Sequence, residues 1–125
     1  MTVEEFIAGA GSREGELVLL DRMIREVAPD LLPFVSDRFL MYGAFRYRYA
    51  SGREGDSARI IVAPRRAGIT LHLACGNGSP VAGTNPGVGC LKIKDLARID
   101  LDALRRELTR AATAHLPQEH PRERE

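Results

Sequence analysis

Hydrophobic positions near both ends of the chain recur with the spacing of amphipathic helices. Thr2 and Glu5 form a Thr-x-x-Glu pattern, which predicts a short helix directly after Thr2. Apolar residues then recur every three or four positions over residues 13–27, and do so again after Asp100, a residue type that often caps helices. The pattern therefore predicts two N-terminal helices, and a closing helix over residues 101–116.

The middle of the chain changes to a period of two, which is typical of β-strands. Apolar and polar residues alternate most clearly over residues 45–49. Four further short apolar stretches predict strands at residues 38–42, 59–63, 69–75 and 90–94. Most connections are too short for a parallel crossover, so we expect antiparallel pairing. The resulting fold class is α+β: a two-layer domain with a roughly five-stranded antiparallel sheet and the N- and C-terminal helices packed on one face.

Two segments fall outside this pattern. Residues 76–89 are rich in Gly, Asn, Pro and Ser, and they predict either a lid over the sheet or a disordered loop. Residues 117–125 are mostly charged, which predicts a disordered tail after a single domain over residues 1–116. No pattern in the chain fixes the oligomeric state.

Composition places the chain among ordinary globular proteins and narrows the range of partners. Of 125 residues, 44% are hydrophobic and 28% are charged, and the net charge is +1. So small a net charge gives no global attraction to nucleic acid or to an anionic membrane. No apolar run approaches the ~20 residues of a membrane helix. The N-terminus lacks a basic-then-apolar leader and there are only two cysteines, so we expect a cytoplasmic protein.

The strand alternation also predicts a candidate binding face. It directs Tyr47 and Tyr49 toward the core, and it collects one histidine, one thiol and four cationic side chains on the helix-free face: Arg46, Arg48, His72, Cys90, Lys92 and Lys94. Such a face favours a small anionic ligand or an acidic partner. The alternative is a plain solvated face, which antiparallel sheets commonly have. Without outward-facing aromatic rings to stack on bases, nucleic acid is not an expected partner.

The two cysteines are expected on opposite faces of the sheet, with Cys75 in the core and Cys90 outside near His72. This separation argues against a disulfide. Nearby lysines would favour a lowered pKa and thiol chemistry at Cys90, whereas the alternative is a cysteine that simply packs. The chain has neither a nucleophile elbow nor a P-loop. Binding is therefore expected in preference to catalysis.

Three segments of the middle region carry a family resemblance. Residues 47–56 (YRYASGREGD), 63–66 (APRR) and 89–94 (GCLKIK) are similar to the YdhG-like domains of unknown function, and the similarity extends over about residues 6–115. The resemblance implies a small α+β domain. One branch of that family contains a frataxin-like iron chaperone, so iron binding is an alternative function.

Two features of the sequence give iron little support. Many relatives carry a basic run before the last strand, whereas residues 83–89 contain no basic residue here. Glu14, Asp21 and Glu26 on the second predicted helix are interleaved with arginines and form no acidic ridge. Because hard metal ions favour clustered oxygen ligands, no metal or other cofactor is predicted from the residues themselves.

Overall fold

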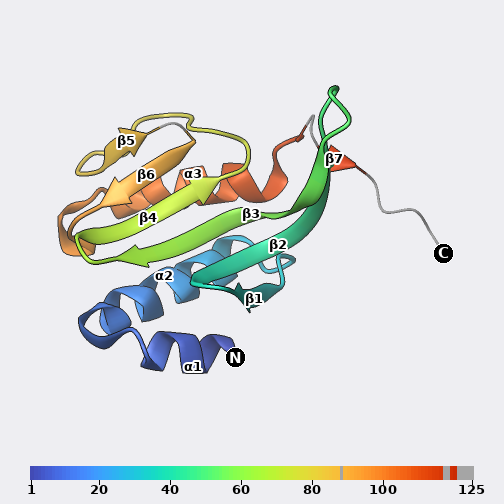
Figure 1. The fold of residues 1–125 in the computed structure, drawn as a ribbon. Coiled ribbons are helices and arrows are strands. Elements are labelled where there is room, and N and C mark those ends of the chain that lie inside the picture. Colours follow the sequence, from blue (N-terminus) through green and yellow to red (C-terminus); the bar gives the residue numbers. More distant parts are fainter. Residues whose placement is uncertain (88, 117–118, 121–125) are drawn as a thin grey trace.

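A computed structural model describes residues 1–87, 89–116 and 119–120 of this protein. An antiparallel sheet forms one layer, and the helices pack against a single face of it (Figure 1). The helices are α1 (Val3–Ala8), α2 (Glu14–Val27) and α3 (Leu101–Thr113), with single 3₁₀ turns at Gly11–Arg13 and Leu96–Arg98. The strands are β1 (Pro33–Ser36), β2 (Phe39–Arg48), β3 (Glu54–Arg65), β4 (Gly68–Leu73), β5 (Asn85–Gly87), β6 (Cys90–Ile93) and β7 (Glu119–His120).

The strands pair in the order β1-β2-β3-β4-β6-β5, and β7 also pairs with β2. Every pairing is antiparallel, which confirms the predicted α+β class. The short connections between β1, β2, β3 and β4 leave no room for a crossover, so consecutive strands are neighbours. The sheet has more strands than expected because β1, β5 and β7 are short and give no alternating pattern of their own.

The two strands predicted at residues 38–42 and 45–49 form one continuous strand, β2. Burial follows Leu40 and Tyr42 and then changes phase to Phe45. Between them Gly43 has φ 74°, a left-handed conformation that interrupts the regular alternation. The sequence pattern showed the change of phase, but it suggested a break between two strands where the structure has one irregular residue.

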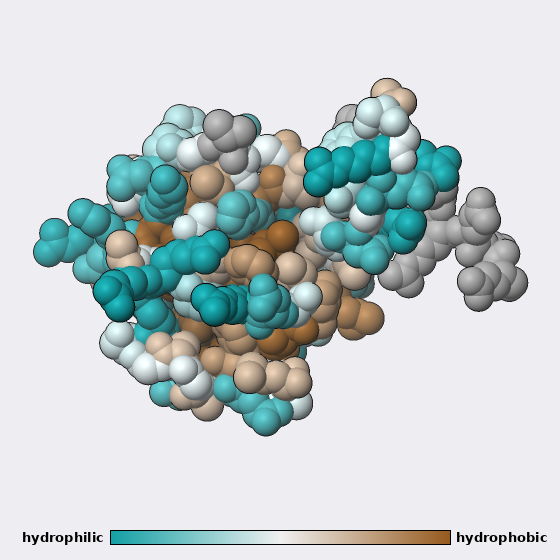
Figure 2. All heavy atoms as spheres, in the orientation of Figure 1, coloured by the Kyte–Doolittle hydropathy of each residue, from teal (hydrophilic) through white to brown (hydrophobic). Residues whose placement is uncertain are grey.

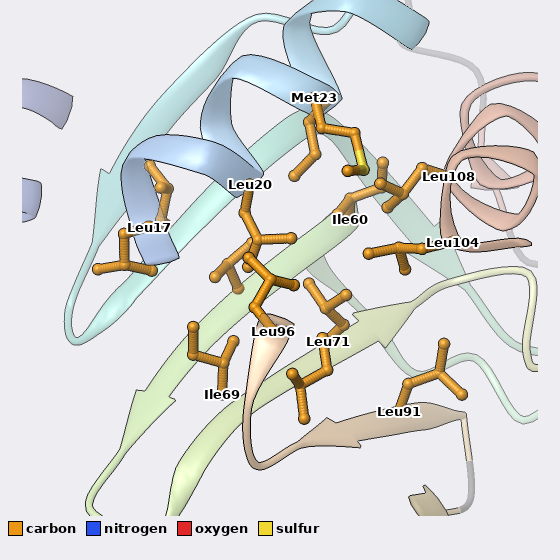
Figure 3. Packing of buried hydrophobic residues seen from close by; sticks show 14 of the residues in the cluster. Leu17, Leu20, Met23, Ile60, Ile69, Leu71, Leu91, Leu96, Leu104 and Leu108 are labelled. Atoms are coloured by element: carbon orange, nitrogen blue, oxygen red, sulfur yellow. The ribbon is translucent and has the colours of Figure 1, made fainter. Parts of the chain in front are cut away.

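The core lies between the sheet and the two long helices (Figure 3). Leu17, Leu20 and Met23 point from α2 toward the sheet, and Leu104 and Leu108 approach from α3. The sheet contributes the side chains that alternate toward the helices, among them Leu40, Ile60, Val62, Leu71 and Leu91. These positions fix which face of each strand is covered, and hence which face is left free.

Both predicted helix starts are confirmed. The Glu5 backbone N–H donates to the Thr2 hydroxyl at 3.1 Å, and the Thr2 backbone N–H donates to the Glu5 carboxylate at 3.0 Å. Asp100 caps α3 by accepting from the Ala103 N–H at 3.1 Å. The closing helix ends at Thr113, earlier than the predicted residue 116.

Most of the predicted disordered tail, namely residues 117–118 and 121–125, lies outside the described residues. The two tail residues that the structure describes form β7, which pairs with Arg46 and Tyr47 of β2. In the described part of the chain, no helix is long and apolar enough to cross a membrane.

Candidate functional site

The strand register divides the six predicted site residues into two groups. His72 and Cys90 are directly opposite each other on β4 and β6, and Lys92 lies opposite Thr70 in the adjoining row. Residues that lie opposite one another on successive strands form a row across the sheet. In the row of His72, the next residues are Ile61 on β3 and Met41 on β2. Arg46 and Arg48 follow Met41 by five and seven positions along β2. At about 3.4 Å per residue, that is roughly 17 Å or more from the row of His72.

The first group lies on the β2–β3 hairpin and is paired with carboxylates. Arg46 is 3.5 Å from both Glu54 and Asp56, and Arg48 forms a close ion pair with Glu54. Arg48 and then Arg46 hold the pKa of Glu54 below its usual value. The two positive charges are therefore balanced across the hairpin, and these arginines do not form one anion site with the lysines.

The second group continues into a basic pocket that the sequence only partly revealed. A hollow of about 250 Å³ lies beside the β3–β4 turn, and its polar lining consists of Arg65, Thr70, Asn85, Lys92 and Lys94. The three cations are exposed. Among the residues that the structure describes, no carboxylate lies within ion-pair distance of any of them. The name basic pocket is used below for Arg65, Lys92, Lys94 and the two neutral side chains.

Hydrogen bonds from the start of α2 hold the backbone at the edge of the basic pocket. Arg13 donates from Nη2 to the Arg66 carbonyl at 3.3 Å, and its Nη1 reaches the Lys94 carbonyl at 3.5 Å. Nη1 also contacts Glu16 at 2.7 Å, and Glu16 in turn accepts from the Leu96 N–H at 2.9 Å. The β3–β4 turn and the end of β6 are thereby tied to one helix. This holds the backbone that presents the cations.

An apolar hollow of about 320 Å³ adjoins this region on the same helix-free face. Phe39, Met41, Ile61 and His72 line it with half-buried side chains. In Figure 2, hydrophobic atoms gather in the middle of this face and hydrophilic side chains surround them. Burial, and to a smaller extent the charge of Arg65, lower the pKa of His72. The imidazole is therefore neutral at pH 7.

Arg65 joins the two hollows. It lines the basic pocket, and its guanidinium carbon lies 5.6 Å from the centroid of the Phe39 ring in the apolar hollow. This is the range of a cation–π contact. A sequence signal for the apolar hollow was present, because residues 39–42 and 60–63 are apolar at every position. Such runs are typical of strands covered on both faces.

The expected exposure of Cys90 was wrong, because Cys90 is only 7% exposed. Cys75 is half-buried and packs against the core, on the side that was expected. Cys90 is buried because β5 pairs with β6 and places Gly87 opposite it. The Cys90 Sγ lies 2.7 Å from where a Cβ on Gly87 would be. Among the described residues, Cys90 has no hydrogen bond to His72, so thiol chemistry gains no support from the geometry.

The segment over residues 76–89 is tied to the rest of the molecule wherever the structure describes it. Asn77 donates from its side chain to the Gly87 and Cys90 carbonyls at 2.8 and 3.1 Å. The Gly78 N–H donates to the buried carboxylate of Glu107 on α3 at 2.9 Å. These bonds hold the segment at the sheet edge beside β6, where it includes β5. They do not support a lid above the sheet.

Metal binding receives no support from the described residues. Across residues 1–87, 89–116 and 119–120, no group of three or more His, Cys, Asp or Glu side chains is close enough to hold a metal ion. Asp21, one of the carboxylates considered for iron, instead accepts from the Tyr42 hydroxyl at 2.6 Å and pairs with Arg25 at 3.0 Å. The iron hypothesis therefore continues to rest on the family resemblance alone.

The fold and site together define an α+β domain with an open antiparallel sheet and two adjoining hollows on its helix-free face. No protein-family model, curated protein or solved structure matched the chain in the comparisons. The similarity to YdhG-like domains thus stays a prediction, and the function is argued from the geometry of the site.

Proposed function

We propose that this chain is a cytoplasmic, non-enzymatic binding domain that takes a small anion, or an acidic group of a partner, in the basic pocket. The observation that carries the proposal is the convergence of Arg65, Lys92 and Lys94 without a carboxylate beside them in the described structure. Like charges held close together repel one another, and a bound anion relieves that repulsion.

The chemistry of the pocket suits a carboxylate or a phosphate. Arg65 presents a planar fork that can donate two parallel hydrogen bonds to two oxygens, whereas the lysines act as point charges. Thr70 and Asn85 add neutral hydrogen-bonding groups to the lining. The two free cysteines, Cys75 and Cys90, are consistent with a reducing compartment.

The test compares two variants that lose the same formal charge. Lys92→Gln/Lys94→Gln removes two cations from the basic pocket, and Arg46→Gln/Arg48→Gln removes two cations that are already paired on the hairpin. Titration calorimetry with inorganic phosphate at low ionic strength should show binding to the wild-type chain and to the arginine variant. The lysine variant should lose about tenfold or more in affinity, because charge-assisted hydrogen bonds contribute roughly 1.5–3 kcal/mol each.

Each other outcome counts against the proposal. An equal loss in both variants would show that phosphate responds to net charge and not to this pocket. Unchanged binding in the lysine variant would place the anion elsewhere. Absence of binding to the wild-type chain would remove phosphate as a ligand and would leave the cations as a solvated surface.

A further inference from the structure

We propose that the ligand of this domain is an amphipathic carboxylate, with its head group in the basic pocket and its apolar body in the apolar hollow. The inference rests on the proposed function and specifies the class of ligand. It follows from the position of the two hollows, which lie on one face and share a boundary.

The two hollows adjoin each other along β4. Thr70 and Lys92 lie opposite each other on β4 and β6 and line the basic pocket, whereas His72, two residues after Thr70 on β4, lines the apolar hollow. The row of His72 also holds Met41 and Ile61. Side chains two residues apart on one face of a strand are about 7 Å apart, so one small molecule can contact the cations and the apolar side chains at once.

The apolar hollow has the size and composition of a ligand site. Its volume of about 320 Å³ lies near the lower end of the range of small-molecule pockets, roughly 300–1,000 Å³. Phe39, Met41 and Ile61 present apolar surface there, although none of the described helices covers this face. Among the described residues of its lining, His72 is the only ionisable side chain, and its lowered pKa leaves it neutral at pH 7. The body of the ligand is therefore uncharged.

Charge complementarity decides the head group. The cations of the basic pocket lie at one end of the apolar hollow, and Arg65 is held over the Phe39 ring at that boundary. A carboxylate at this point would accept hydrogen bonds from the Arg65 guanidinium and lie near Lys92. A polyanion such as inorganic phosphate would fill the basic pocket alone and leave the apolar hollow empty.

The experiment measures the affinity of straight-chain carboxylates, from acetate to decanoate, by calorimetry below their micelle concentrations. Affinity should rise about fourfold for each added methylene until the hollow is filled, since each buried methylene contributes about 0.8 kcal/mol. The slope is measured on the wild-type chain, so it does not depend on a variant that fails to fold.

Variants then assign the two ends of the ligand. Met41→Gln should reduce the gain in affinity for each added methylene of the carboxylate and leave the affinity for phosphate unchanged. Lys92→Gln/Lys94→Gln should weaken all the carboxylates by a similar factor and preserve the slope. The matched control, Arg46→Gln/Arg48→Gln, should change neither. Thermal unfolding of each variant confirms that it is folded.

Other results overturn the inference and can be told apart from failure of the proposed function. If phosphate binds and the number of methylenes in the carboxylate has no effect on its affinity, the basic pocket is an anion site and the amphipathic ligand is refuted. If octanoate binds equally well to the lysine variant, the head group does not lie in the basic pocket. If sedimentation shows that the protein is a dimer and octanoate does not bind to that dimer, the occupant of the hollow is a second copy of the chain.

Discussion

At the scale of single residues, His72 shows how burial sets a charge state. The ring is half-buried in the apolar hollow, and burial disfavours its charged form, with a smaller contribution from Arg65. An unfolded chain carries this histidine with a pKa near 6.5. Below that pH the unfolded state binds a proton that the folded state resists.

Stability should therefore fall as the pH drops below about 6.5, because the unfolded state takes up more protons. Urea unfolding of the wild-type chain at pH 7.5, 6.5 and 5.5 measures this slope. His72→Gln should reduce it, and His115→Gln, which changes an exposed histidine, should leave it as it is. The same pH slope in wild type and His72→Gln would show that His72 contributes nothing.

At the scale of elements, β2 is continuous because a glycine occupies its irregular position. Gly43 has φ 74°, and a Cβ there would lie 2.8 Å from the Leu31 Cδ2 atom. The burial pattern of the strand changes phase at this residue. The alternation of residues 45–49 was evident in the sequence, but the joining of two short strands depended on a backbone angle that a hydropathy pattern does not encode.

Gly43→Ala should destabilise the protein by about 1–3 kcal/mol, the usual cost of holding a residue with a Cβ in such a conformation. Gly15→Ala is the matched control, because Gly15 lies in α2 with nothing within 4 Å of the added methyl group. The free energy of unfolding of the Gly15→Ala variant should be unchanged or raised by up to about 1 kcal/mol. Urea unfolding measures both, and similar values for the two variants would contradict the argument.

At the scale of the whole molecule, the layers are joined by polar contacts between residues distant in sequence. Glu107 of α3 is only 4% exposed, and it accepts from the Gly78 N–H at 2.9 Å and pairs with Arg110 at 3.1 Å. Arg110 in turn donates to the Gly76 carbonyl. This cluster fastens the segment before β5 to the helix layer, and so it helps to keep β5 beside Cys90.

Glu107→Ala should cost about 1–3 kcal/mol, because it leaves buried hydrogen-bonding partners unsatisfied. Arg105→Ala, also on α3, breaks an exposed ion pair with Glu26 of α2 and should cost less than about 1 kcal/mol. Hydrogen exchange at Gly78 should quicken in the first variant and not in the second. Equal stabilities and unchanged exchange would show that the cluster does not hold the segment.

The sequence by itself determined the elements whose signals are local. Hydrophobic spacing predicted the two long helices, Thr2 and Asp100 predicted helix starts, and short connections predicted antiparallel pairing. These features depend on interactions within a few residues, so a linear pattern contains them.

Only the tertiary structure decided how the candidate site is assembled. Alternation placed Arg46 and Lys92 on one face, but the register set them far apart and brought Arg65 to the lysines in place of the hairpin arginines. The pairing of β5 with β6 buried Cys90. Register and edge pairing are contacts between segments distant in the chain, and one change of strand phase or one added strand alters which side chains meet.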